Sequence, residues 1–260
     1  MDTFQGGGVK MLGFVADKMM FPGVLSKPGT EQRQSFLFFK HENSRQVLLY
    51  SHGNCESIAL ISDQMEKMCW RLGVSVCCYE YPGYMDGQGS SETQVNEAAH
   101  QILQWLIFYK KYECRHIILM GRSIGTGPTL WLASREPRQR FAAIILQSPF
   151  TSIRNLAEEI LRPALGCMFF LPILHPWVIG SKYDNVSFIK KVNVDTPILF
   201  IHGKQDRVIP VEMTEVLASH AHLHDSHVIH IQEESTHNAF DEATMFLYMM
   251  HFVNATSKTE

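Results

Sequence analysis

The most restrictive feature of this sequence is the pentapeptide Gly121-Arg122-Ser123-Ile124-Gly125. It lies between the apolar run His116–Met120, which predicts a strand, and Thr126–Ser134, which predicts a helix. A serine at the apex of a sharp strand-to-helix turn projects its hydroxyl from a strained backbone. Side chains two residues before or after it would collide with the strand or the helix, which explains glycine at both positions. The pattern therefore predicts a nucleophile elbow with Ser123 at its apex.

Strand-like and helix-like segments alternate through most of the chain. The predicted strands are Phe36–Phe39, Gln46–Ser51, Val74–Tyr79, His116–Met120, Phe141–Leu146, Pro197–His202 and His227–Ile231. The predicted helices include Ser57–Leu72, Gln94–Tyr112, Val211–Ala221 and Asp241–Val253. We expect the first two strands to pair as a hairpin. Repeated βα units with nearly continuous apolar strands predict an α/β fold with a doubly wound, mostly parallel sheet.

One segment interrupts this alternation and divides the predicted domain. Residues 151–195 contain a helical stretch followed by an apolar run broken by prolines. That run is shorter and more interrupted than the uninterrupted span of about 20 apolar residues that a transmembrane helix needs. We expect residues 36–150 and 196–260 to form the core and residues 151–195 to form a small cap inserted after the strand Phe141–Leu146. Residues 1–35 are interpreted as an N-terminal extension.

Two side chains follow later predicted strands at the positions that a serine nucleophile needs. A serine hydroxyl requires a base within hydrogen-bond reach, and a third group to orient that base. Asp206 follows the strand Pro197–His202 and is the sole carboxylate of its loop, while His237 follows the last predicted strand. The chain order serine, acid, histidine is the order found on doubly wound hydrolase sheets. The sequence therefore predicts Ser123, Asp206 and His237 as a catalytic triad.

An oxyanion hole is also expected, because stabilising the tetrahedral intermediate is a large part of acyl transfer. One donor should be the backbone N–H of Ile124, the residue after the nucleophile. The second should come from the loop Ser51-His52-Gly53-Asn54-Cys55, where we assign the N–H of Asn54. His52 is expected to hold this loop rather than to act as the base.

Composition narrows the class of protein further. The formal net charge of −3 over 260 residues gives no indication of a nucleic-acid partner. The six cysteines form no C-x-x-C pair, and no secretory signal is recognised in the first residues. We expect reduced cysteines and a cytoplasmic protein.

Taken together, the motifs are similar to those of a known superfamily. They are Ser-His-Gly-Asn at 51–54, Tyr81-Pro-Gly-Tyr84, the pentapeptide at 121–125, Ser148–Ser152, His-Gly-Lys-Gln-Asp at 202–206 and Thr-His-Asn at 236–238. The chain resembles the α/β-hydrolase superfamily from about Phe36 to Val253 and, within it, the α/β-hydrolase-domain-containing (Bem46-like) serine hydrolases. This resemblance implies an α/β-hydrolase fold and the same triad. Some of these relatives are protein depalmitoylases that carry an N-terminal cysteine cluster or other anchor, whereas residues 1–35 contain no cysteine.

We therefore expect a serine hydrolase that cleaves ester or thioester bonds of a lipophilic acyl substrate through an acyl-enzyme intermediate. The substrate would be a small molecule or a lipidated protein, and no metal or cofactor is expected. Apolar cap residues would contact the acyl chain, foremost Met168, Phe169, Phe170 and Trp177. An apolar cap also fits transient docking on a membrane surface or packing on the core. A peptidase or amidase with the same machinery, or a non-catalytic scaffold that retains the fold, are the alternative functions.

Overall fold

The computed structural model describes residues 36–84, 90–165, 182–221 and 227–257. Its central feature is a seven-stranded sheet in the order β1-β3-β2-β4-β5-β6-β7. The strands are β1 (Phe36–Phe39), β2 (Val47–Ser51), β3 (Ser75–Tyr79), β4 (Ile117–Arg122), β5 (Ala143–Gln147), β6 (Ile198–Gly203) and β7 (Val228–Gln232). Strands β2 to β7 pair in parallel, and β1 is antiparallel to β3. The mostly parallel sheet predicted from the sequence is confirmed.

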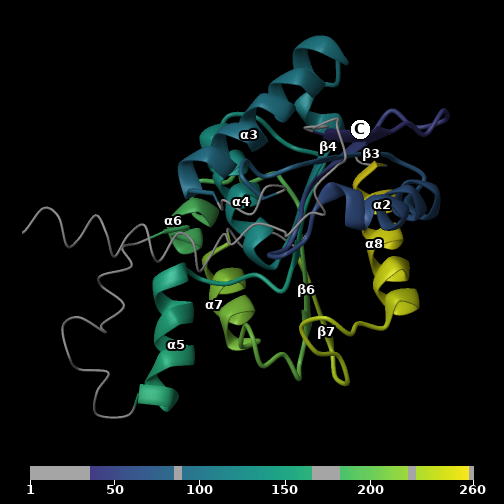
Figure 1. Cartoon of the computed structure of the whole chain (residues 1–260). Coiled ribbons are helices and arrows are strands. Elements are labelled where there is room, and N and C mark those ends of the chain that lie inside the picture. Colours follow the sequence, from purple (N-terminus) through teal and green to yellow (C-terminus); the bar gives the residue numbers. More distant parts are fainter. Residues whose placement is uncertain (1–35, 85–89, 166–181, 222–226, 258–260) are drawn as a thin grey trace, which may run out of the picture.

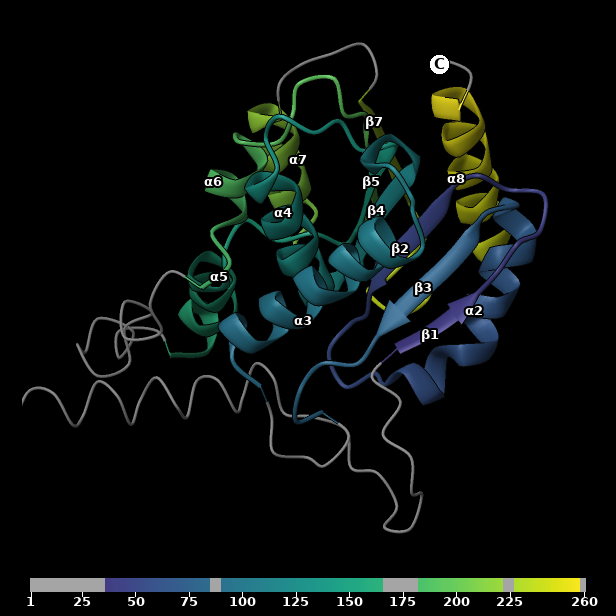
Figure 2. The ribbon, with the colours of Figure 1, turned by 90° about the horizontal axis from the view of Figure 1, so that it is seen from above.

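Helices cover both faces of this sheet. Figures 1 and 2 show α2 and α8 on one side and α3, α4, α6 and α7 on the other. Their bounds are α2 (Ile58–Leu72), α3 (Glu92–Gln104), α4 (Thr126–Arg135), α6 (Asn185–Ile189), α7 (Glu212–His220) and α8 (Glu242–Ser257). The predicted helix 94–112 ends differently from expectation, because α3 passes into a π-helical turn at Trp105–Tyr109. Helices on both faces confirm the doubly wound arrangement.

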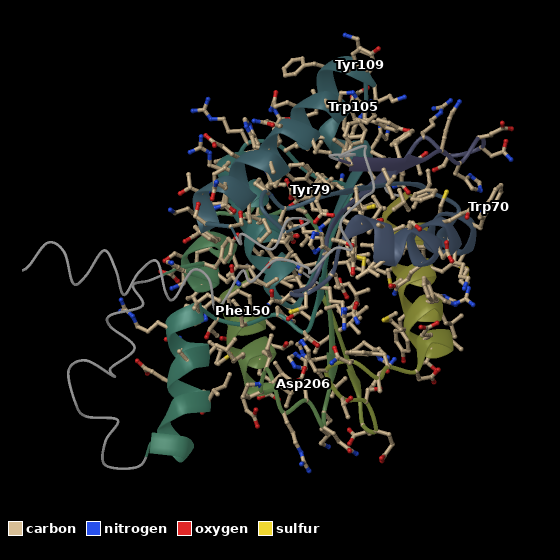
Figure 3. All side chains as sticks on the ribbon, in the orientation of Figure 1. Trp70, Tyr79, Trp105, Tyr109, Phe150 and Asp206 are labelled. Atoms are coloured by element: carbon tan, nitrogen blue, oxygen red, sulfur yellow. The ribbon has the colours of Figure 1, made fainter. Side chains whose placement is uncertain are left out.

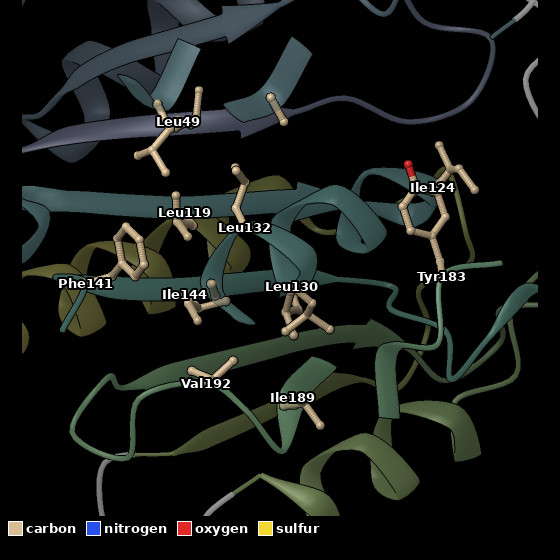
Figure 4. Close-up of a cluster of buried hydrophobic side chains, with 14 of the residues drawn as sticks. Leu49, Leu119, Ile124, Leu130, Leu132, Phe141, Ile144, Tyr183, Ile189 and Val192 are labelled. Atoms are coloured by element: carbon tan, nitrogen blue, oxygen red, sulfur yellow. The ribbon is translucent and has the colours of Figure 1, made fainter. Parts of the chain in front are cut away.

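Each face has its own apolar core, and neighbouring strand residues contribute to opposite cores. Val47 and Leu49 pack on the side of α3 and α4, whereas Leu48 packs on the side of α2 and α8. Cys77 belongs to the first of these cores and Cys78 to the second. Figure 4 shows the first of these cores from β2 to the segment that contains Ile189 and Val192. Burial on both faces explains why the strands are apolar at nearly every position.

The expected hairpin between the first two strands is wrong. Residues Phe36 to Phe39 of β1 pair with Tyr79 to Val76 of β3, not with β2. The reason is that β2 has parallel neighbours on both edges, β3 and β4, so neither edge is open to β1. Strand β1 therefore pairs with the outer edge of β3 and forms one edge of the sheet.

Part of the predicted cap can be described. Helix α5 (Ile153–Leu165) follows β5 and lies at the lower end of the sheet in Figure 1, to the left of α7. The expected acyl-contacting residues Met168, Phe169, Phe170 and Trp177 lie outside the described residues, as does the extension 1–35. The domain boundaries remain predictions. None of the helices formed by the described residues is both long and apolar enough to cross a membrane.

Tyr183 precedes α6, and its fully buried ring contacts α4. A Cβ atom placed on Gly127 of α4 would lie 2.5 Å from Cγ of Tyr183. Glycine is therefore required here by close approach, although alanine is the better helix former by about 1 kcal/mol.

We predict that Gly127→Ala lowers the free energy of unfolding by about 1–3 kcal/mol, since the tightly packed ring cannot move without strain. Urea denaturation monitored by circular dichroism measures this change. The double variant Gly127→Ala/Tyr183→Leu should lose less stability than the sum of the losses in the two single variants, because the smaller side chain removes the overlap. Full additivity, or a more stable Gly127→Ala, would contradict the proposed packing.

Candidate active site

The turn after β4 has the geometry predicted for a nucleophile elbow. Ser123 has a φ of 54°, the left-handed region that residues other than glycine rarely adopt. A Cβ on Gly121 would lie 2.5 Å from Oγ1 of Thr129, and one on Gly125 would overlap the carbonyl oxygen of Ser51. Both glycines are thus fixed by steric contact, and the serine between them is held in a strained conformation.

Ser123, His237 and Asp206 meet in one chain of hydrogen bonds. Nε2 of His237 lies 3.0 Å from Oγ of Ser123, and Nδ1 of His237 lies 2.7 Å from Oδ2 of Asp206. The acid follows β6 and the histidine follows β7, as predicted. A backbone hydrogen bond of 2.9 Å, from the N–H of Gln205 to the carbonyl of Ser235, joins their loops. Figure 3 places Asp206 at the lower end of the sheet, on the opposite end from Trp105 and Tyr109.

The carboxylate of Asp206 is fully buried and held by several donors. Burial raises the pKa of Asp206, but hydrogen bonds from His202, His237 and the N–H of Ile209 outweigh it, so the pKa lies well below its ordinary value. The N–H groups of Val208 and Ile209 each donate to Oδ1 at 2.8 Å. Asp206 is therefore ionised at neutral pH, accepts the Nδ1–H of His237 and leaves Nε2 free to accept a proton.

His202 is a member of this arrangement that the sequence did not single out. Its side chain is fully buried, with Nε2 3.3 Å from Oδ2 of Asp206 and 2.9 Å from the carbonyl of Ile209. Nδ1 lies 2.6 Å from the hydroxyl of Thr214. With Thr214 donating to Nδ1, Nε2 carries the proton and faces the carboxylate. His202 is the next-to-last residue of β6, and nothing at that position in the sequence indicated its contact with Asp206.

The loop after β2 is held in place by aromatic side chains. The Tyr81 hydroxyl donates to the carbonyl of His52 at 2.7 Å, and the Tyr84 hydroxyl donates to Oδ1 of Asn54 at 2.9 Å. The buried ring of His52 stacks on Tyr81 with 3.8 Å between ring centroids, and its Nδ1 donates to the carbonyl of Gly53. His52 thus lies beneath the loop, in the supporting position expected for it.

Asn54 and Ile124, the two expected oxyanion donors, line the same cavity as Ser123 and His237. Ile124 is the second residue of the 3-10 turn Ser123–Gly125, and the first N–H groups of a helical turn have no partner within it. The cavity has a volume of about 490 Å³. An N–H at each of these positions suits an oxygen atom bound beside the Ser123 hydroxyl.

Part of the lining of this cavity is apolar. It comprises Phe150, three residues of α5, and the loop residues Val208 and Ile209; the α5 residues are Ile153, Leu156 and Ile160. The three α5 residues recur at the spacing of one helix face. Ile160 and Val208 remain 49% and 46% exposed, so apolar surface continues to the rim of the cavity. The sequence indicated an apolar cap but assigned the substrate contacts to later residues.

Arg122 lines the cavity beside Ser123 and bonds to two neighbouring loops, through Glu56 and Asn238. Sequence analysis assigned no role to these three residues, because a polar residue within a motif carries no signal of its distant partners. The described residues contain no group of three or more His, Cys, Asp or Glu side chains able to hold a metal ion.

Fold and site together define the chain as an α/β hydrolase, and comparison with known proteins agrees. Residues 87–257 match the sequence profile of the prolyl oligopeptidase family. The chain belongs to this family, within the α/β-hydrolase superfamily.

Individual relatives agree with this placement. The chain is 31% identical to human alpha/beta hydrolase domain-containing protein 17B over 169 residues, which cover 64% of this chain and 52% of that protein. It is 29% identical to the mouse protein 17C over 187 residues, which cover 71% of this chain and 52% of that protein. The chain thus spans about half the length of these relatives.

Solved structures share the fold at low sequence identity. A monoacylglycerol lipase from Paleococcus ferrophilus superimposes with a TM-score of 0.62 at 16% identity, covering 85% of this chain and 98% of that one. A soluble variant of monoglyceride lipase from Saccharomyces cerevisiae gives 0.62 at 15% identity, covering 90% and 96%. These likenesses establish the α/β-hydrolase fold.

The depressed pKa of Asp206 predicts how stability changes with pH. A carboxylate whose folded-state pKa lies below its ordinary value of 3.8 stabilises the fold above that value, and the contribution is lost as the pH falls through the folded-state pKa. Asp206→Asn should therefore be less stable than the wild type at pH 7, by about 1–3 kcal/mol. The difference should shrink between about pH 5 and pH 2.

Urea unfolding of the two proteins across that pH range measures the difference. Asp63→Asn, at an exposed position on α2, controls for the loss of one negative charge. A stability gap between Asp206→Asn and the wild type that stays constant down to pH 2 would contradict the ionised, hydrogen-bonded carboxylate.

Proposed function

We propose that this chain is a serine hydrolase that cleaves ester or thioester bonds of a lipophilic acyl substrate through an acyl-enzyme intermediate. The observation that carries the proposal is the continuous hydrogen-bonded chain from Ser123 through His237 to Asp206, with an apolar-walled cavity at the serine. A hydroxyl, an imidazole and a buried carboxylate in this order are the parts of acyl transfer.

Acylation follows from the hydrogen-bond directions. Ser123 Oγ attacks the carbonyl carbon while Nε2 of His237, at 3.0 Å, takes the hydroxyl proton. Asp206 keeps Nδ1 protonated and stabilises the imidazolium that forms. The protonated Nε2 then gives its proton to the departing alkoxide or thiolate, and the acyl group remains on Ser123.

The intermediate oxyanion would be held by the N–H groups of Ile124 and Asn54. Each such donor contributes about 3–4 kcal/mol in comparable sites. Tyr84 and Tyr81 support the loop that carries Asn54, which favours a preorganised hole. Water then attacks the acyl-enzyme with His237 as base, and the acid product leaves.

The apolar wall formed by α5 and the residues after Asp206 favours an acyl chain as the group bound beside Ser123. The lipases among the structural neighbours bear names that agree with such a substrate. Removal of a palmitoyl group from a protein is one activity within this proposal, alongside hydrolysis of a small lipid ester.

Cleavage of peptide or amide bonds is a second candidate function, favoured by the name of the matched family. Another structural neighbour is a puromycin-hydrolyzing peptidase from Mycobacterium tuberculosis, at a TM-score of 0.63, 17% identity and coverage of 85% of this chain and 37% of that one. The same triad serves both chemistries.

We predict that a fluorophosphonate probe labels the purified protein once, at Ser123, and that Ser123→Ala abolishes both labelling and ester hydrolysis. Loss of the nucleophile should lower kcat by at least about 10⁴-fold. Intact-mass spectrometry and peptide mapping locate the adduct. Ser134→Ala, on α4, serves as the control serine variant. Absence of labelling in a folded wild type would favour the non-catalytic scaffold.

We predict that kcat/KM rises with acyl length in a series of 4-nitrophenyl esters and that Ile160→Ala lowers it for long chains by about 10-fold while sparing acetate. Leu247→Ala is the matched control, because Leu247 on α8 is 48% exposed, close to the 49% of Ile160, and does not line the cavity. A flat length dependence that Ile160→Ala leaves unchanged would remove the acyl-chain proposal.

The ratio of ester to amide turnover separates the two candidate functions. A long-chain 4-nitrophenyl ester and the matching 4-nitroanilide present the same acyl group with different leaving atoms. We predict a large preference for the ester beyond their intrinsic difference in reactivity. A greater enhancement of anilide than of ester hydrolysis, each relative to the uncatalysed rate, would favour the peptidase instead.

A further inference from the structure

We propose that Arg122 is a positioning residue that fixes the oxyanion loop and the histidine loop on either side of Ser123. The inference rests on the serine-hydrolase function proposed above. It concerns a residue that contacts neither the Ser123 hydroxyl nor the His237 ring through any hydrogen bond of the described residues, and that acts through two loops instead.

The first connection runs from Arg122 to the oxyanion loop. Nη1 of Arg122 donates to Oε1 of Glu56, and Oε2 of the same carboxylate accepts the N–H of Gly53 at 2.6 Å. Gly53 directly precedes Asn54, the expected oxyanion donor. The Glu56 carboxylate therefore transmits the position of the guanidinium to the peptide beside Asn54.

The second connection runs to the histidine loop. Nη2 of Arg122 donates to Oδ1 of Asn238 at 2.8 Å. Asn238 directly follows His237 in the chain. Arg122 directly precedes Ser123 in the chain. Its side chain therefore connects the segment that carries the nucleophile to both neighbouring loops by hydrogen bonds.

Burial and chemistry suit arginine to this task. The side chains of Arg122 and Glu56 are 19% and 18% exposed, so water competes little for the bond between them, whereas Asn238 is exposed. A planar guanidinium presents separate N–H groups in fixed directions, whereas a lysine ammonium is a compact charge on a flexible stem. One guanidinium can thus serve the two partners at once, and a lysine at this position would lose that geometry while keeping the charge.

Arg122→Lys is the central test, with ester hydrolysis as the readout. A loosened oxyanion loop and histidine should lower kcat by about 10- to 100-fold. KM should change by less than about 3-fold, because the apolar wall of α5 is untouched. Arg115→Lys is the matched control: Arg115 pairs with Glu113 through side chains that are 57% and 63% exposed, and this variant should retain wild-type kinetics.

Asn238 offers a conservative rescue. Asn238→Ala removes the second connection and should lower kcat about 10-fold, whereas Asn238→Asp keeps an acceptor for Nη2 and should retain most of the activity. Equal losses in both variants, or an Arg122→Lys effect confined to KM or to thermal stability, would overturn the positioning role.

Hydrogen exchange tests the same proposal without catalysis. Arg122→Lys should accelerate amide exchange in the loops around residues 53–56 and 236–239 together, while the β4 amides keep their wild-type protection. If the wild type proves inactive toward every ester and toward the fluorophosphonate, the hydrolase function fails, yet this exchange pattern still decides whether Arg122 connects the two loops. Unchanged exchange in both loops would refute the connection.

Discussion

The backbone of Ser123, with a φ of 54°, sets the conditions that the rest of the site must meet. A left-handed serine costs about 1–2 kcal/mol relative to an ordinary conformation and persists when its surroundings fix it. Gly125 supplies that restraint, because a Cβ there would lie 2.6 Å from the carbonyl of His52 and overlap that of Ser51. The elbow and the end of β2 are thus in direct backbone contact. The same contact places the loop of Asn54 beside the serine hydroxyl.

The parts predictable from the sequence are those that local pattern determines. Apolar runs marked the strands from β2 to β6, since strands buried on both faces tolerate few polar residues. The edge strand β7 is more exposed and was marked by its β-branched residues. Chain order and strand ends then located Asp206 and His237, whose contacts with each other and with Ser123 the structure shows. The pairing of β1 was not predictable in this way. Pairing depends on which strand edge is open, and that is a property of the assembled sheet.

Other features of the site depend on contacts between distant segments. Arg122 and Glu56 are 66 residues apart, and Arg122 and Asn238 are 116 apart, so neither contact leaves a periodic signal in the sequence. The contacts expected at Met168 and its neighbours lie outside the described residues and stay a prediction. The described part of the cavity is lined by one face of α5 at Ile153, Leu156 and Ile160, which sequence analysis did not assign. Helical periodicity in residues 153–160 was the usable signal, but it does not tell which partner the face meets.

The arrangement of charges around Ser123 agrees with the neutral acyl ligand proposed above. The Asp206 carboxylate is fully buried, accepts hydrogen bonds from His202, His237 and backbone N–H groups, and is not among the residues that line the cavity. The charge of Arg122 is matched by Glu56. In the proposed reaction, stabilisation of a developing oxyanion would fall to backbone dipoles at the serine, which act at short range and cost little reorganisation. The ion pair of Arg122 and Glu56 offers no unmatched positive charge to an anionic substrate. An uncharged acyl group would contact the apolar surface of α5. The charges and the apolar lining therefore agree with the uncharged acyl substrate proposed above.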